Sequence, residues 1–140
     1  MEKSEIGILI SRADRKVIRR FRALIEKEPI KVIKEPTAGS IMVTAKDFLD
    51  VAFCLGEVLV TEALVEYEDT KGYGLIIGDE PEKALVLAFI DAVYKSKNES
   101  LKKKLETILL KTKTTIEEKD KLERAVISKT RVNFEIMAKR

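Results

Sequence analysis

The feature that most constrains the fold is the stretch of residues 53–84, where two β-rich runs are followed by the start of a helix. The first run is rich in β-branched residues, namely Val58, Val60, Thr61 and Val65. Turn-forming residue types at 69–72 (DTKG) interrupt it before YGLII resumes the pattern. Asp79 precedes Glu82 by three residues and Pro81 lies in the first turn, which is typical of a helix N-terminus. The stretch therefore predicts strand, turn, strand and helix.

The N-terminal part predicts two helices followed by two short strands. Apolar residues recur there at spacings of three and four, at Ile6, Ile10, Ala13, Val17, Phe21 and Leu24. A break near Arg12, with Asp14 as the cap of the second helix, divides the region into two helices that end before Pro29. Residues 30–35 and 40–46 are strand-like and are separated by PTAG, so the chain is expected to have about four strands.

The C-terminal part predicts further helices and an extended tail. Residues 80–96 are apolar almost all round, which indicates a core helix packed on the sheet. A third helical segment follows Asn98 as its cap, and a fourth begins near Thr115, with KTKTT at 111–115 as a hinge between them. The tail alternates Val132, Phe134 and Ile136 as an extended segment would. We therefore expect an α+β fold, with a mostly antiparallel sheet, helices on one face, and a helical, then extended, C-terminal region.

Composition indicates a single domain, residues 1–140, of a soluble cytoplasmic protein. A chain of this length buries enough surface to fold without disulfides, and its single Cys54 excludes an internal one. The longest apolar run is far shorter than a membrane span, so no membrane association is expected. Charged residues make up 36% of the chain but the net charge is only +3, with the basic excess in residues 98–140.

The residue content argues against catalysis by this chain alone. There is no histidine, which removes the usual general base and a common metal ligand, so no metal site is predicted. On one strand Glu57 and Glu62 would point to opposite faces, which does not suit a carboxylate pair. Gly72 and Gly78 are interpreted as turn and strand-exit residues, because the glycines flank a strand where a dinucleotide site needs a strand-to-helix turn. A stand-alone enzyme with Cys54 as nucleophile is a third alternative, and the lack of histidine argues against it. Free cysteine also mostly behaves as a small buried hydrophobe, so Cys54 is expected to be one.

The first helical region carries the best candidates for binding an anion or a partner. Its basic residues lie opposite the apolar stripe, and the candidates are Arg12, Arg15 and Arg19. On one helix face these arginines could meet phosphate, nucleic acid or an acidic protein surface, or could form a solvated outer surface. A small nucleic-acid-binding module is therefore the alternative function. It is disfavoured by the low net charge and by the lack of aromatic residues among the arginines.

Several segments together resemble one family, the PhnG family of the phosphonate carbon–phosphorus lyase system. The resemblance lies in residues 31–43 (KVIKEPTAGSIMV), in the hairpin stretch, and in residues 129–140 (KTRVNFEIMAKR). The positions that match the sequence motifs of the family are Gly39, Gly56, Glu57, Thr61, Arg131, Asn133 and Phe134. Residues 46–53 stand where many relatives have a glycine-rich loop, and Glu62 stands where many have arginine, so no anion-binding role is carried over to either.

The resemblance implies an accessory subunit with no catalytic residues of its own. The complex in that family converts ATP and an alkylphosphonate such as methylphosphonate into a ribose 1-alkylphosphonate 5-triphosphate and adenine, and a separate iron–sulfur protein later cleaves the carbon–phosphorus bond. The implied partners are the other core subunits, with no nucleic acid, and a homo-oligomer is compatible with this role. No cofactor is expected in this subunit, whereas ATP is expected as a substrate of the complex.

Overall fold

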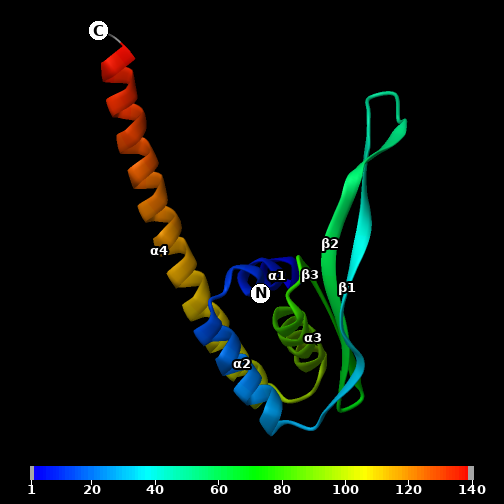
Figure 1. Cartoon of the computed structure of the whole chain (residues 1–140). Coiled ribbons are helices and arrows are strands. Elements are labelled where there is room, and N and C mark those ends of the chain that lie inside the picture. Colours follow the sequence, from blue (N-terminus) through cyan, green and yellow to red (C-terminus); the bar gives the residue numbers. More distant parts are fainter. Residues whose placement is uncertain (1, 139–140) are drawn as a thin grey trace.

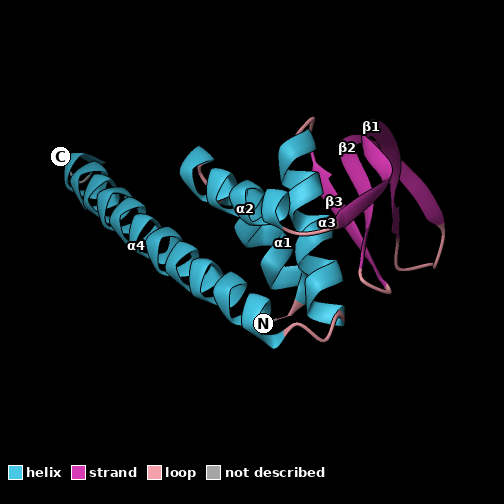
Figure 2. Ribbon diagram, turned by 90° about the horizontal axis from the view of Figure 1, so that it is seen from below, coloured by secondary structure: helices cyan, strands magenta, loops and turns pink. Residues whose placement is uncertain are grey.

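A computed structural model of the chain describes the backbone of residues 2–138 and the side chains of residues 2–127. Within these residues the chain forms four helices and three strands: α1 (Lys3–Arg12), α2 (Arg15–Lys27), β1 (Ile30–Lys46), β2 (Ala52–Tyr67), β3 (Thr70–Ile77), α3 (Pro81–Lys95) and α4 (Glu99–Ala138). The strands form one antiparallel sheet in the order β1-β2-β3 (Figure 1). The helices lie together on one side of this sheet (Figure 2), which confirms the expected α+β class.

Two elements project from this body. The hairpin of β1 and β2 is about twice as long as β3, and its far half rises beyond the rest of the sheet (Figure 1). Helix α4 has 40 residues, which corresponds to a length of about 60 Å. Its first half packs beside α1 and α2, and its second half extends into solvent away from the hairpin (Figure 1).

Helix α3 packs very closely against β3 because both surfaces carry small side chains. Gly72 and Gly74 lie on the face of β3 that meets α3, and Ala84, Ala88 and Ala92 form the facing stripe of the helix. A Cβ atom built on Gly74 would lie 2.6 Å from the backbone nitrogen of Ala88. One on Gly72 would lie 2.5 Å from that of Ala92. Gly72 is therefore a packing residue within the strand. Its assignment as a turn residue was wrong, since the turn lies at Glu68 and Asp69.

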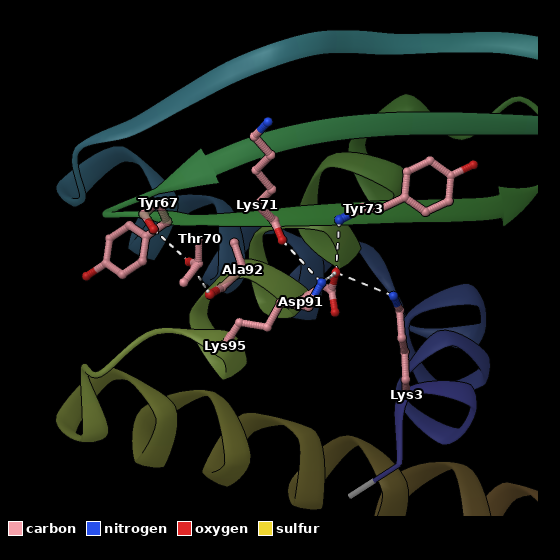
Figure 3. Close-up of polar contacts among 8 residues, drawn as sticks. All are labelled: Lys3, Tyr67, Thr70, Lys71, Tyr73, Asp91, Ala92 and Lys95. Atoms are coloured by element: carbon pink, nitrogen blue, oxygen red, sulfur yellow. Dashed lines mark hydrogen bonds and ion pairs between the residues drawn. The ribbon is translucent and has the colours of Figure 1, made fainter.

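Polar contacts also attach helix α3 to β3 (Figure 3). The carboxylate of Asp91 accepts hydrogen bonds from the backbone nitrogen of Tyr73 at 3.0 Å and from the Lys95 ammonium at 3.1 Å. The ammonium of Lys3 approaches the same carboxylate oxygen at 3.4 Å. The side chain of Asp91 is only 9% exposed, so these partners compensate a nearly buried charge and join α1, α3 and β3.

The N-terminal helices form as the sequence predicts. Asp14 caps α2 by accepting a hydrogen bond from the backbone nitrogen of Val17 at 3.1 Å. Ile10 and Phe21 are fully buried, so the predicted apolar stripe is the inner face of both helices. The core helix is also confirmed as α3, but its N-cap is Glu80, which makes no side-chain cap bond, and not Asp79.

The expectation of four strands was wrong because the two N-terminal strand-like runs form a single strand, β1. The PTAG segment does not end the strand. Pro36 lies in a register irregularity between Lys34 and Thr37, on the outer strand of the sheet. An edge strand tolerates proline because the missing N–H breaks no ladder bond when it faces solvent.

The predicted hinge at residues 111–115 was also wrong, and so was the extended tail. The helix that Asn98 caps, through the backbone nitrogen of Leu101 at 3.1 Å, continues without interruption to Ala138. The hinge segment contains no glycine or proline, and its threonine hydroxyls donate to carbonyls four residues earlier: Thr112 to Ile108, Thr114 to Leu110 and Thr115 to Lys111. Such bonds are compatible with helix, so threonine content alone does not end one.

We predict that Gly74→Ala destabilises the protein, because the added methyl group must push α3 away from the sheet. The free energy of unfolding should fall by about 1–3 kcal/mol, as for other small-to-large changes in packed interiors. Urea unfolding followed by circular dichroism measures this change. The matched control is Gly39→Ala, since a Cβ at Gly39 meets no atom within 4 Å. Equal stability of the two variants would contradict the close-packing account.

Candidate functional site

The most distinctive surface of the protein is the far part of the β1–β2 hairpin, which we call the hairpin arm (residues 37–59). The last paired residue of β3 is Ile77, opposite Val60, so beyond this point β2 has β1 as its only neighbour in the sheet. Helix α3 covers the sheet below the arm (Figure 1). Most side chains in the arm are therefore exposed.

Apolar side chains cover both faces of the arm. Cross-strand partners share a face, so the pairs Ile41–Val58 and Ala45–Phe53 lie on the face opposite α3. Met42 lies on the other face and is 63% exposed. Large exposed apolar residues continue over the whole arm, at Ile41, Met42, Val43, Phe48, Leu49, Val51, Phe53, Leu55 and Leu59. A contiguous apolar surface of this kind is typical of a protein-interaction site.

The tip of the arm is an ordered loop that presents two apolar side chains to solvent. The carboxylate of Asp47 accepts hydrogen bonds from the backbone nitrogens of Leu49 at 2.9 Å and Val51 at 3.0 Å. Asp50 adopts a left-handed conformation with φ of 61°, which closes the loop. Phe48 is 95% exposed and Leu49 is 69% exposed. Phe48 and Leu49 were not among the residues predicted for the site, although Asp47 and Asp50, which flank the apolar pair, indicate a loop.

The family-motif positions of the hairpin do not converge on one point. Gly39 pairs with Val60 near the base of the arm. Gly56, with φ of 147°, adjoins the irregularity at Leu55 near the tip, where few residues other than glycine fit. Glu57 points to the face of Met42. These residues therefore shape the arm and place one carboxylate on it, without forming a common pocket.

Thr61 has a structural position at the base of the arm. It is 1% exposed, and its hydroxyl donates to the carbonyl of Gly78 at 2.6 Å. The same hydroxyl accepts from the backbone nitrogen of Glu80 at 3.0 Å. The two bonds hold the connection between β3 and α3 against β2. Thr61 therefore supplies the hydrogen bond at the start of α3 that the expected cap, Asp79, does not.

Glu62 forms a small polar cluster on the sheet face opposite α3. Its carboxylate contacts the ammonium of Lys34 and accepts a hydrogen bond from the hydroxyl of Tyr73 at 2.7 Å. The bond from Lys34 and then that from Tyr73 lower the pKa of Glu62. The carboxylate in turn raises the pKa of Tyr73. Glu62 is thus engaged within the sheet as the counter-charge of Lys34.

The arginine candidates separate into two groups. Arg12 is held by α4, because its guanidinium donates to both carboxylate oxygens of Asp120, at 2.7 and 3.1 Å. This bidentate bond raises the pKa of Arg12 and lowers that of Asp120. Arg12 therefore joins the end of α1 to the middle of α4 and is not placed with the other candidates.

Arg15 and Arg19 are brought together in an open groove of about 830 Å³ between the N-terminal ends of α2 and α3. Arg22 and Lys83 line the same groove together with three carboxylates, and they pair with two of these, Arg22 with Glu82 at 2.8 Å and Lys83 with Glu80 at 4.0 Å. Lys16 and Arg20 follow at the neighbouring exposed positions of α2. Like charges four residues apart on a helix repel each other, so this face suits an anionic partner.

The remaining sequence candidates add no catalytic group. Cys54 is exposed on the hairpin arm, contrary to the expectation of a small buried hydrophobe. Arg131, Asn133 and Phe134 lie on the helical backbone of α4, and their side chains fall outside the described residues. Among the side chains that are described, no group of three or more acidic, cysteine or histidine residues is placed to hold a metal ion. Within the described residues, none of the helices has the length and apolar character that a membrane crossing requires.

The fold and this surface define a small α+β protein whose most exposed apolar surface is a protruding hairpin. A family model described as "Phosphonate metabolism protein PhnG" matches residues 2–140, and the chain therefore belongs to the PhnG family. The resemblance found from the residues is thus confirmed. As a family member, the chain has a role in phosphonate metabolism as a subunit of the multi-protein carbon–phosphorus lyase complex. A search of the curated proteins found no match.

We predict that Thr61→Val lowers stability, because it removes the buried hydroxyl that bonds the backbone nitrogen of Glu80 and the carbonyl of Gly78. The expected loss is about 1–3 kcal/mol in the free energy of unfolding. In a chain of this size that corresponds to a melting temperature several degrees lower, roughly 2–4 °C per kcal/mol. The control Thr61→Ser keeps the hydroxyl and should lose less. A larger loss in the serine variant would show that the methyl group, and not the hydrogen bonds, matters at this position.

Proposed function

We propose that this chain is an accessory, docking subunit of the carbon–phosphorus lyase core complex, and that it supports the formation of α-D-ribose 1-methylphosphonate 5-triphosphate from ATP and methylphosphonate. The hairpin arm is the observation that carries the proposal. A subunit of a complex needs a surface whose exposure to water is unfavourable and whose burial against a partner is favourable. The arm has that character on both faces and at its tip.

The tip supplies the natural anchor of such an interface. Interfaces draw much of their binding energy from a few large side chains, often aromatic, that enter a pocket on the partner. Phe48 and Leu49 are exposed on a loop that Asp47 already orders. Burying one such side chain contributes about 1.5–3 kcal/mol. The ordered loop also reduces the conformational entropy that is lost on binding.

The chemistry of the complex is assigned to the other core subunits. The chain contains no histidine, and ATP enters as a substrate of the whole complex and not as a cofactor of this subunit. The groove with Arg15 and Arg19 is proposed as the contact for an acidic partner surface or for substrate phosphates. The last part of α4, with Arg131, Asn133 and Phe134, is proposed as a third contact with the partners.

The main test changes the tip of the arm. Phe48→Asp combined with Leu49→Asp should abolish co-purification with the other core subunits, because two charges would have to enter an apolar pocket. The melting temperature should stay unchanged, since both side chains are exposed in the isolated chain. Co-expression followed by size-exclusion chromatography measures assembly. Adenine release from ATP plus methylphosphonate measures function, which should fall with assembly.

The control for this test is Ile8→Asp, which places a charge at an exposed apolar position on α1, away from the arm. This variant should assemble normally. Adenine release by the purified chain alone would overturn the accessory role. Normal assembly of the double tip variant would show that the tip is not the anchor.

The basic face of α2 also favours the alternative of a small nucleic-acid-binding module, and one pair of substitutions separates the two functions. Under the proposal, Arg15→Glu with Arg19→Glu weakens complex formation, while affinity for duplex DNA is negligible in both forms. The control, Lys103→Glu with Lys104→Glu, makes the same change of charge on exposed positions of α4. Salt-sensitive, sub-micromolar DNA binding that only the arginine variant loses would favour the alternative.

A further inference from the structure

Strand β1 is an edge strand, and its two halves differ in how well they are protected against pairing with a further strand. In the first half, charged side chains at Lys31, Lys34 and Glu35, together with Pro36 and two register irregularities, hinder pairing with another strand. In the second half, residues 37–45 (TAGSIMVTA) carry no charge and no proline. An edge is usually blocked along its whole length in a protein that functions alone. The open half is therefore a specific feature of the hairpin arm.

The register shows which backbone groups of this open half face outward. The backbone nitrogen of Gly78 donates to the carbonyl of Leu59 at 2.8 Å, so Leu59 and alternate residues of β2 bond toward β3. The intervening residues Val58 and Val60 then bond toward β1, where their partners are Ile41 and Gly39. It follows that the N–H and C=O groups of Ala38, Ser40 and Met42 point away from the sheet. These groups form a ready-made edge for a further strand.

We propose that residues 37–45 of β1 accept an extended segment of another core subunit as an additional strand of this sheet. The proposal rests on the proposed function as a docking subunit and specifies how the partner is held. Backbone hydrogen bonds to the outward groups would supply affinity. The apolar side chains on both faces, such as Ile41 and Met42, would select an uncharged, apolar segment.

Two observations favour another chain over this one as the source of the strand. Within residues 2–138, all three strands already lie in the sheet, and the other elements are helices. A second copy paired through these same residues is disfavoured by its charges. The antiparallel register that pairs residues 37–45 with the same residues of a second copy would set Asp47 opposite Glu35 at both ends. Like charges that face each other across strands are destabilising.

The test is a proline at an outward-facing position. Ser40→Pro removes one outward N–H and places a ring on the edge, while the bonds of β1 to β2 remain. The preceding residue is Gly39, whose lack of a side chain minimises the clash that proline imposes on its neighbour. Ser40→Ala keeps the N–H and is the matched control. The two variants are co-expressed with the other core subunits and compared by size-exclusion chromatography and by the melting temperature of the isolated chain.

The expected result is that Ser40→Pro folds with a nearly unchanged melting temperature but binds its partners at least about tenfold more weakly, as the loss of one hydrogen bond and a steric block imply. Ser40→Ala should assemble like the unchanged protein. Equal assembly of both variants would overturn the strand pairing and leave the docking role intact. Failure of the unchanged protein to assemble would instead overturn the proposed function. If the isolated protein is a dimer that only Ser40→Pro dissociates, a second copy occupies the edge and the proposal is wrong.

Amide hydrogen exchange of the unchanged protein provides a test that needs no substitution. In the isolated chain the amides of Ala38, Ser40 and Met42 should exchange fast, and those of Gly39 and Ile41 slowly, because they bond to β2. In the complex the three outward amides should become protected as well. Fast exchange of these amides in the assembled complex would overturn the proposal, even if Ser40→Pro proves unstable.

Discussion

The close contact between α3 and β3 is the interaction on which the rest of the structure depends. Gly72 and Gly74 leave the middle of one face of the strand without side chains, and the alanine stripe at Ala84, Ala88 and Ala92 lets the helix backbone approach that face directly. Helices α1, α2 and α4 then pack around α3. These glycines and alanines thus set the position of the whole helical layer, because their small size lets α3 pack closely on the sheet.

This arrangement buries one face of the sheet and leaves the other uncovered. Since the four helices of residues 2–138 gather on the α3 side (Figure 2), the opposite face is covered, among the described side chains, by those of the sheet itself, including the polar cluster of Lys34, Glu62 and Tyr73. Beyond the end of β3 the helices no longer cover the sheet, and the hairpin arm is exposed on both faces. An isolated two-stranded ribbon is marginally stable in water, so the arm is best stabilised by a partner. The same features that make it a poor surface for a monomer therefore make it suitable for a complex.

Local patterns predicted those parts of the chain where one physical signal dominates. The hairpin of β2 and β3, the cap at Asp14 and the core helix all follow from β-branched runs, capping residues and apolar periodicity. The errors arose where tertiary context overrides a local signal. Pro36 suggested a break, yet an edge strand tolerates it. The threonines at 112, 114 and 115 suggested a hinge, yet their hydroxyls bond back along the helix. Phe48 and Leu49 carry no periodic signal, so only the structure shows them on an exposed tip.

The open edge at residues 37–45 also bears on how much of this protein a cell can safely make. An uncharged edge with several β-branched residues can pair with a similar strand when its proper partner is absent, which is a route to aggregation. Copies made in excess of the other subunits would therefore aggregate or be degraded. We expect synthesis of this chain to be balanced with that of its partners, so that the edge is covered soon after the sheet has formed.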